Sequence, residues 1–152
     1  MSSPWRSLLT AALLGAAPAE AQQVRELGVQ AIATASDPVL VTAAGYVGWR
    51  TSRRMRVSAA AGIGVADGDA AWRGEALLHF LFTSRARRGV GGYAAGGVAV
   101  VGGPVDQGYL VLTAGLETRP GSTGGWFLEA GVGGGARVAL GFRRRWLGGW
   151  GR

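Results

Sequence analysis

The feature that most constrains this chain is an alternation of apolar residues with small or polar ones. In the segment 108–119, Leu110 and Leu112 fall on one face of an extended chain, and Thr113 and Glu117 fall on the other. A period of two residues is the signature of a β-strand. The same pattern recurs in eight segments, at residues 24–35, 38–50, 54–66, 71–83, 89–101, 108–119, 124–135 and 137–146.

The connections and lengths of these segments define an architecture. Only short, turn-like pieces such as "SDP" and "ADGDA" separate them, so crossover helices have no room and the strands must form antiparallel hairpins in sequence order. The segments have 10 to 13 residues, whereas soluble strands commonly have about five or six and strands tilted across a bilayer about 9 to 11. We therefore predict an all-β fold, an eight-stranded antiparallel up-and-down barrel.

The second face of each segment decides which side of the barrel meets water. It consists mainly of glycine, alanine, serine and threonine, with sparse charges and a few large residues such as Tyr46, Tyr93 and Phe127. A solvent-facing surface normally carries about a quarter or more charged residues. The pattern favours a transmembrane β-barrel with an apolar outside and a small or polar inside. The alternative is a soluble periplasmic lipocalin-like carrier of an apolar ligand, with the apolar face turned inward.

The N-terminus has the pattern of an export signal. Arg6 precedes the apolar stretch "LLTAALLGAA", and small residues at Ala19 and Ala21 form a cleavage site. We therefore expect residues 1–21 to be a signal peptide and residues 22–152 to be the barrel domain. The net charge is +7, but an exported protein rarely meets nucleic acid, so we expect no such partner. The chain has no cysteine, which excludes thiolate chemistry and cysteine metal sites.

The mature chain as a whole resembles the small eight-stranded outer-membrane β-barrels of Gram-negative bacteria, the OmpA/OmpX-like and opacity-protein-like group. The resemblance is one of pattern, and the last segment "RVALGFRRRW" is similar to the terminal assembly signal of that group, although the chain continues through "LGGWGR". It implies an outer-membrane location, a monomer, and contact with outer-membrane lipids and the envelope assembly machinery. The expected role is structural, in envelope integrity or lipid contact, with a small pore as an alternative.

Charged residues on the inward face form the first candidate site. In a low-dielectric lumen unpaired charges are too costly to keep, so we expect glutamate–arginine pairs there, with His79 beside them. Eight strands leave little open bore, which favours side chains that fill the lumen over a gate or narrow ion path. The predicted lumen network comprises Glu26, Arg56, Arg73, Glu75, His79, Glu117, Glu129, Arg137 and Arg143.

Residues near the strand ends form the second candidate site. Both termini are periplasmic in the family that the chain resembles, which places the loop aspartates, such as Asp67, at the cell surface and most arginines at the periplasmic end. We expect a basic rim that contacts lipid headgroups and an aromatic girdle at the membrane interfaces. The rim comprises Arg53, Arg54, Arg85, Arg87, Arg88, Arg144 and Arg145. The girdle comprises Trp49, Trp72, Trp126 and Trp146.

Nothing in the sequence points to catalysis, a metal or a cofactor. His79 is the only histidine, and position 81 is a leucine where the lipid A deacylases of this barrel class have the serine of a His-x-Ser pair. "DGDA" at residues 67–70 lacks the closing glutamate of a calcium loop, so we interpret it as a turn. We expect a non-enzymatic protein.

Overall fold

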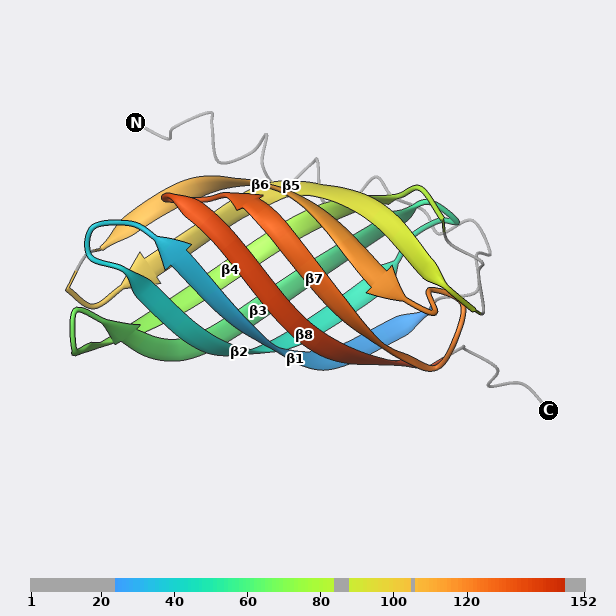
Figure 1. The fold of residues 1–152 in the computed structure, drawn as a ribbon, viewed down its shortest axis with the longest axis horizontal. Helices are drawn as coiled ribbons and strands as arrows, with labels where there is room; N and C mark the ends of the chain where they lie inside the picture. The colour runs from blue at the N-terminus through green and yellow to red at the C-terminus, as the bar shows by residue number, and fades with distance from the viewer. Residues whose placement is uncertain (1–23, 84–87, 105, 147–152) are drawn as a thin grey trace, which may run out of the picture.

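A computed structural model of the chain describes residues 24–83, 88–104 and 106–146. These residues form eight antiparallel strands in a closed barrel, in which each strand pairs with its sequence neighbours and β1 pairs with β8 (Figure 1). The strands are β1 (Arg25–Ala35), β2 (Leu40–Arg50), β3 (Met55–Ala66), β4 (Asp69–Leu81), β5 (Val90–Gly102), β6 (Gln107–Thr118), β7 (Gly124–Val132) and β8 (Ala136–Trp146). The predicted all-β, up-and-down barrel is confirmed. The signal peptide and cleavage site expected within residues 1–21 lie outside the described residues.

The strand bounds agree with the eight predicted segments to within three residues, and β4 shows why they differ. The sequence placed a turn of several residues before position 71, but β4 begins at Asp69, which pairs with Ala66. Only Asp67 and Gly68 form the turn, with φ values of 52° and 86°. Two consecutive positive φ angles define a type I′ hairpin, for which Asp-Gly is a favoured pair. The first two residues of "DGDA" are therefore a tight turn, as interpreted from the sequence, and the last two begin β4.

The alternation predicted from the sequence appears as an apolar outside and a closed inside. Outward side chains are exposed along every strand, for example Leu110 at 79% and Ile63 at 76%. By the same alternation, outward strand positions carry charge only at Arg25 and Arg144, both at the barrel end where β1 begins and β8 ends. A band of aliphatic, aromatic and small residues therefore surrounds the barrel, as in membrane-spanning barrels.

Large aromatic side chains pack inside the barrel against glycines of the next strand. Tyr93 pairs with Gly115, and Phe127 pairs with Gly141. A Cβ atom on either glycine would meet the ring of its partner at 2.3 Å. Only glycine leaves enough room for the rings at these two positions. The rings in turn cover the backbone of the glycines, which have no side chain to shield it.

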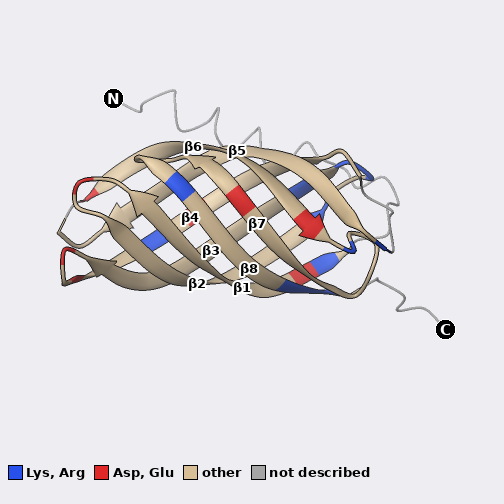
Figure 2. Cartoon of the chain, viewed as in Figure 1, with Lys and Arg blue, Asp and Glu red and all other residues tan. Residues whose placement is uncertain are grey.

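The exposed charges at the two ends of the barrel are opposite in sign (Figure 2). The end that holds the β1–β2, β3–β4 and β5–β6 turns carries Asp37, Asp67, Asp69 and Asp106. The opposite end holds the start of β1, the end of β8 and the exposed arginines. We call these the loop end and the terminus end.

Candidate functional site

The interior holds a network of paired charges contributed by seven of the strands, all except β5. Every member except Arg50 is buried. Its members among the described residues are Glu26, Arg50, Arg56, Arg73, Glu75, Glu117, Glu129, Arg137, Arg143 and Arg145. Buried charges are costly unless they are paired, and each charge of the network has a partner of opposite sign in one of two clusters.

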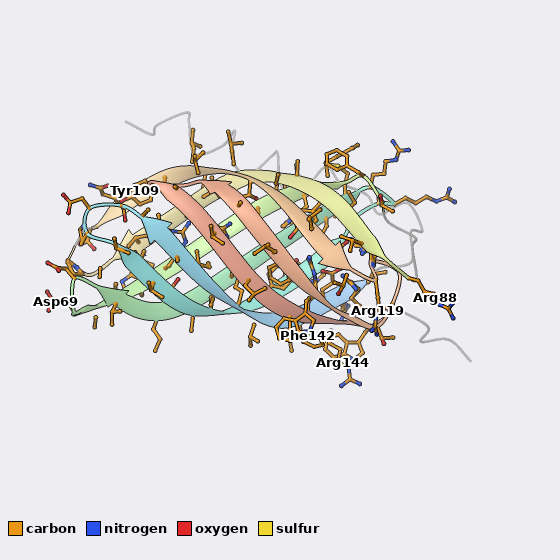
Figure 3. The ribbon with its side chains drawn as sticks, viewed as in Figure 1. Asp69, Arg88, Tyr109, Arg119, Phe142 and Arg144 are labelled. Carbon is orange, nitrogen blue, oxygen red and sulfur yellow. The ribbon has the colours of Figure 1, made fainter. Side chains whose placement is uncertain are left out.

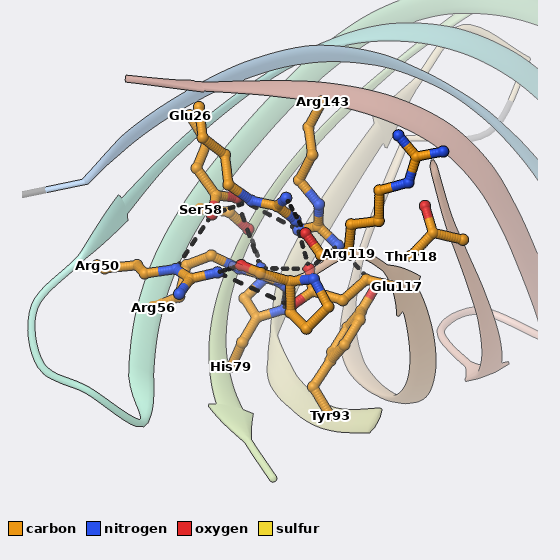
Figure 4. A network of polar contacts seen from close by, with 12 residues as sticks. Glu26, Arg50, Arg56, Ser58, His79, Tyr93, Glu117, Thr118, Arg119 and Arg143 are labelled. Atoms are coloured by element: carbon orange, nitrogen blue, oxygen red, sulfur yellow. Dashed lines mark hydrogen bonds and ion pairs between the residues drawn. The ribbon is translucent and has the colours of Figure 1, made fainter. Parts of the chain in front are cut away.

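The first cluster, near the terminus end, is built around Glu117 and Glu26 (Figure 4). Oε2 of Glu117 lies 2.9 Å from Nη2 of Arg143, 2.9 Å from Nη2 of Arg145 and 3.2 Å from Nη1 of Arg56. Glu26 lies 3.2 to 3.5 Å from the same three arginines. One carboxylate on β6 and one on β1 thus tie together arginines from β3 and β8, across the lumen.

This first cluster has more guanidinium groups than carboxylates, and backbone oxygens supply further acceptors. Arg50 donates to Glu26 and to the carbonyl of Pro120 at 3.0 Å. Arg145 donates to the carbonyls of Arg119 and Ser122, each at 3.2 Å. The β6–β7 turn therefore caps the barrel end and takes up donors that the two glutamates cannot satisfy.

The second cluster lies deeper and balances two arginines with two glutamates. Arg137 on β8 donates to Glu129 on β7 at 2.9 Å and to Glu75 on β4 at 2.8 Å. Arg73 donates to Glu75 at 3.1 Å, and Gln30 donates to the same carboxylate at 3.2 Å.

Tyr93 connects the two clusters. Its hydroxyl group donates to Glu129 at 2.8 Å and lies 3.5 Å from Nη2 of Arg143, which can donate to it. The guanidinium groups of Arg56 and Arg143 also lie 4.9 and 5.5 Å from the centre of the Tyr93 ring, within cation–π range. The interior is therefore one continuous polar network rather than separate ion pairs.

His79 belongs to this network through two neighbours on β3. Nη2 of Arg56 donates to Nδ1 of His79 at 3.1 Å, and Nε2 of His79 lies 2.7 Å from the hydroxyl oxygen of Ser58. Because a guanidinium group has no acceptor, Nδ1 must accept and the ring proton must lie on Nε2. The imidazole then donates to Ser58. In this tautomer His79 cannot take a proton from the Ser58 hydroxyl, which a general base would have to do.

The structure places the predicted lumen residues together and adds three that the sequence analysis did not assign to the network. Arg145 was assigned to the basic rim, but its side chain is buried in the first cluster. Arg50 lies at the same end and also reaches inward. Both residues occupy inward positions in the alternation of their strands. The alternation in the sequence could therefore have predicted that their side chains point into the lumen. Ser58 is also an inward position, but it pairs with Leu77 and reaches His79 diagonally, from β3 to β4. The spacing of residues in the sequence does not show such a contact.

Of the other predicted rim residues, four are exposed and point away from the network: Arg53, Arg54, Arg88 and Arg144. Figure 3 shows Arg88, Arg119 and Arg144 projecting from the terminus end. The guanidinium carbon of Arg144 lies 6.0 Å from the centre of the Trp146 ring. Arg85 and Arg87 lie outside the described residues.

The predicted girdle tryptophans all lie on the outer surface. Their side chains are 45 to 57% exposed, and three of the four, Trp49, Trp126 and Trp146, lie at the terminus end. Trp126 packs against Phe142 there, with ring centres 5.4 Å apart. Trp72 lies toward the loop end. The aromatic belt is therefore denser at the basic end.

A cavity of about 200 Å³ lies at the loop end of the lumen. Leu40, Ala66, Ala71 and Val101 form an apolar cluster in its wall, with Tyr109 packed against it. The sequence analysis did not predict this cavity, because it depends on how side chains from several strands fill one level of the barrel.

The described residues form neither a metal-binding cluster nor a long apolar helix. No grouping of three or more histidine, cysteine, aspartate or glutamate side chains that could hold a metal ion occurs among residues 24–83, 88–104 and 106–146. In the same part of the chain, no helix is long and apolar enough to cross a membrane.

Comparisons with known proteins identify the fold. No protein-family model and no curated protein matches the chain. Among solved structures, the chain is similar to the N-terminal β-barrel domain of OprF from Pseudomonas aeruginosa, with a TM-score of 0.63 and 14% sequence identity. The match covers 82% of this chain and 100% of that domain. The resemblance inferred from the sequence pattern is thus confirmed at the level of fold, because this chain and that domain share the architecture of a small β-barrel.

Proposed function

We propose that this chain is a structural outer-membrane protein, a closed barrel that neither catalyses a reaction nor conducts ions freely. The main support for the proposal is the distribution of charge between the outward and the inward face of the barrel wall. Among the outward positions of the eight described strands only Arg25 and Arg144 are charged, whereas the lumen holds the paired network. A soluble carrier of an apolar ligand would need the opposite partition, with charges outside and an apolar middle. The partition therefore supports a lipid-facing exterior.

The pore alternative is disfavoured by side chains that cross the lumen. Arg56 and Arg143 have no exposed area, and Arg137 and Glu117 are each 1% exposed. Their contacts join strands that are not neighbours, such as β3 with β6 and β4 with β8. An ion would have to break several charge-assisted hydrogen bonds to pass, and an eight-stranded barrel has no spare width beside them.

Conductance in planar bilayers tests the closed lumen. We expect the wild-type barrel to give no discrete conductance steps, and we expect steps from a variant in which Glu75, Glu129 and Arg137 are all replaced by alanine. The matched control replaces three exposed side chains, Arg53, Arg54 and Asp69, by alanine and should stay silent. Regular steps from the wild type would show that the lumen conducts.

We also propose that the basic rim contacts anionic lipid headgroups. Arg53, Arg54, Arg88 and Arg144 are exposed beside the aromatic belt, and arginines near an anionic surface are attracted to it by about 1 kcal/mol each. The long side chain of Arg144 covers Trp146 and can place its charge at the interface.

Refolding into vesicles tests this contact. The free energy of unfolding should rise when phosphatidylglycerol is added to phosphatidylcholine vesicles. The rise should shrink in a triple variant with Arg53, Arg54 and Arg144 replaced by glutamine, and should persist in an Asp37→Asn, Asp69→Asn control. An equal rise in both variants would refute the contact.

The expected signal peptide belongs to the same proposal, because an outer-membrane barrel must be exported. Mass spectrometry of the protein purified from outer membranes should give a mature chain that begins at Gln22. A chain that retains Met1 in the outer membrane would refute cleavage near Ala21.

A further inference from the structure

The cavity at the loop end combines an apolar wall with a buried cation. Its lining includes residues from the loop ends of β1 to β6. On β4 the lining residues are Ala71 and Arg73, and Arg73 is the deeper of the two in the barrel. Arg73 is only 2% exposed. The cavity therefore lies between the loop-end mouth and the second charged cluster, with Arg73 at its inner boundary.

Arg73 has hydrogen-bonding capacity that the described residues do not use. Its Nε donates to Glu75, and its Nη1 donates to the hydroxyl oxygen of Thr34 at 3.3 Å. Its Nη2 has no partner among the described residues. A buried N–H without an acceptor is unfavourable, and native proteins nearly always satisfy such groups. Thr34 also lines the cavity, and its hydroxyl group, which accepts from Arg73, can also donate its own proton.

We propose that this cavity binds a small monocarboxylate with an apolar or aromatic tail. One carboxylate oxygen would accept from Nη2 of Arg73 and the other from the hydroxyl group of Thr34, while the tail would pack against Leu40, Val101 and Tyr109. A cavity of 150 Å³ is large enough for benzene, so the 200 Å³ here accommodates an aromatic ring with one carboxylate.

The guanidinium group of Arg73 favours an anionic acceptor over a neutral one, because a hydrogen bond between two charged groups is stronger than one to a neutral oxygen. Six arginines face four glutamates in the described network, and His79 is neutral in the tautomer that its contacts require. The formal excess of positive charge belongs to the first cluster near the terminus end. The second cluster beside the cavity is balanced, so the selectivity for an anion depends on Arg73 itself. Asp37 opposes an anion at the cavity, but its side chain is exposed at the mouth, where water screens it.

Titration with benzoate, followed by ¹⁵N NMR of the barrel in micelles, tests the proposal. We expect saturable shifts of the Arg73 side-chain Nε–H and of the Thr34 amide, with half-saturation on the order of 1 mM, as is typical for so small a ligand. Benzamide and benzylamine have the same ring and similar size, and they should bind at least tenfold more weakly. They also control for partitioning into the micelle.

Two tryptophan variants locate the site without removing Arg73. Val101→Trp fills the cavity and should weaken benzoate binding at least tenfold, whereas Ile63→Trp adds an indole to the outer face, where Ile63 is 76% exposed, and should leave binding unchanged. Circular dichroism confirms that both variants fold. Three results would each overturn the proposal: no saturable shift with benzoate, equal binding of benzamide, or benzoate binding that survives Val101→Trp.

Discussion

Arg137 on β8 and Glu75 on β4 form a 2.8 Å ion pair across the lumen, between strands that are four positions apart in both directions around the barrel. The same guanidinium group also holds Glu129 on the adjacent strand β7. An interaction that joins opposite walls stabilises closure of the barrel and occupies its bore at the same time.

Removing Arg137 should destabilise the barrel, because Glu129 and Glu75 would each lose a buried partner. We expect Arg137→Met to lower the free energy of unfolding by about 3 kcal/mol, the scale found when one partner of a buried ion pair is removed. Urea titration in vesicles measures this. Arg53→Gln, at an exposed position, should change it by less than about 0.5 kcal/mol. Equal effects of the two substitutions would mean that the network contributes no stability.

The outer face should tolerate charge only near its ends. Leu112 is 64% exposed in the middle of β6, and Val90 is 60% exposed at the start of β5. If lipid surrounds the band, Leu112→Arg should cost about 2–4 kcal/mol and Val90→Arg about 0–1 kcal/mol. The same urea titration compares them. A soluble barrel would show little difference between the two positions.

The contact of Tyr93 with Gly115 predicts a specific cost for one methyl group. Gly115→Ala would place a Cβ atom 2.3 Å from the Tyr93 ring, so we expect a loss of about 1–3 kcal/mol from overpacking. Gly74→Ala is the matched control, because its Cβ atom would lie 3.5 Å from Val100, an ordinary contact. Thermal unfolding, followed by gel migration, should give a lower midpoint for Gly115→Ala than for Gly74→Ala. Coincident unfolding curves would show that the Tyr93 ring can move aside to make room for the methyl group.

The hydrogen bonds of His79 predict that neither it nor Ser58 takes part in catalysis. Replacing either residue by alanine should leave the lipid A and phospholipid profiles of the expressing cells unchanged, as read by mass spectrometry. His79→Ala should nevertheless lower stability, because Nη2 of Arg56 loses its acceptor. A lipid modification that appears with the wild type and disappears with both variants would identify a Ser–His enzyme.

The sequence was sufficient to predict the strands and their two faces, because both depend on one local rule, the alternation that a closed barrel imposes. The sequence did not predict which side chains of different strands contact one another across the lumen. Arg145 was assigned to the rim because it lies at the expected periplasmic end of its strand. However, β8 continues to Trp146, so Arg145 is still an inward position in the alternation of that strand. The Ser58–His79 contact and the loop-end cavity depend on how side chains from different strands fill the same level, and a single strand's pattern carries no such information.

The central claim, that this chain is a closed barrel inserted in the outer membrane, is tested most directly by gel migration of the outer-membrane fraction with and without heating. We predict that the protein is recovered in that fraction, remains insoluble without detergent, and migrates differently before and after boiling, because the unheated barrel stays folded. Recovery in the aqueous periplasmic fraction, with one migration position under both conditions, would contradict the claim.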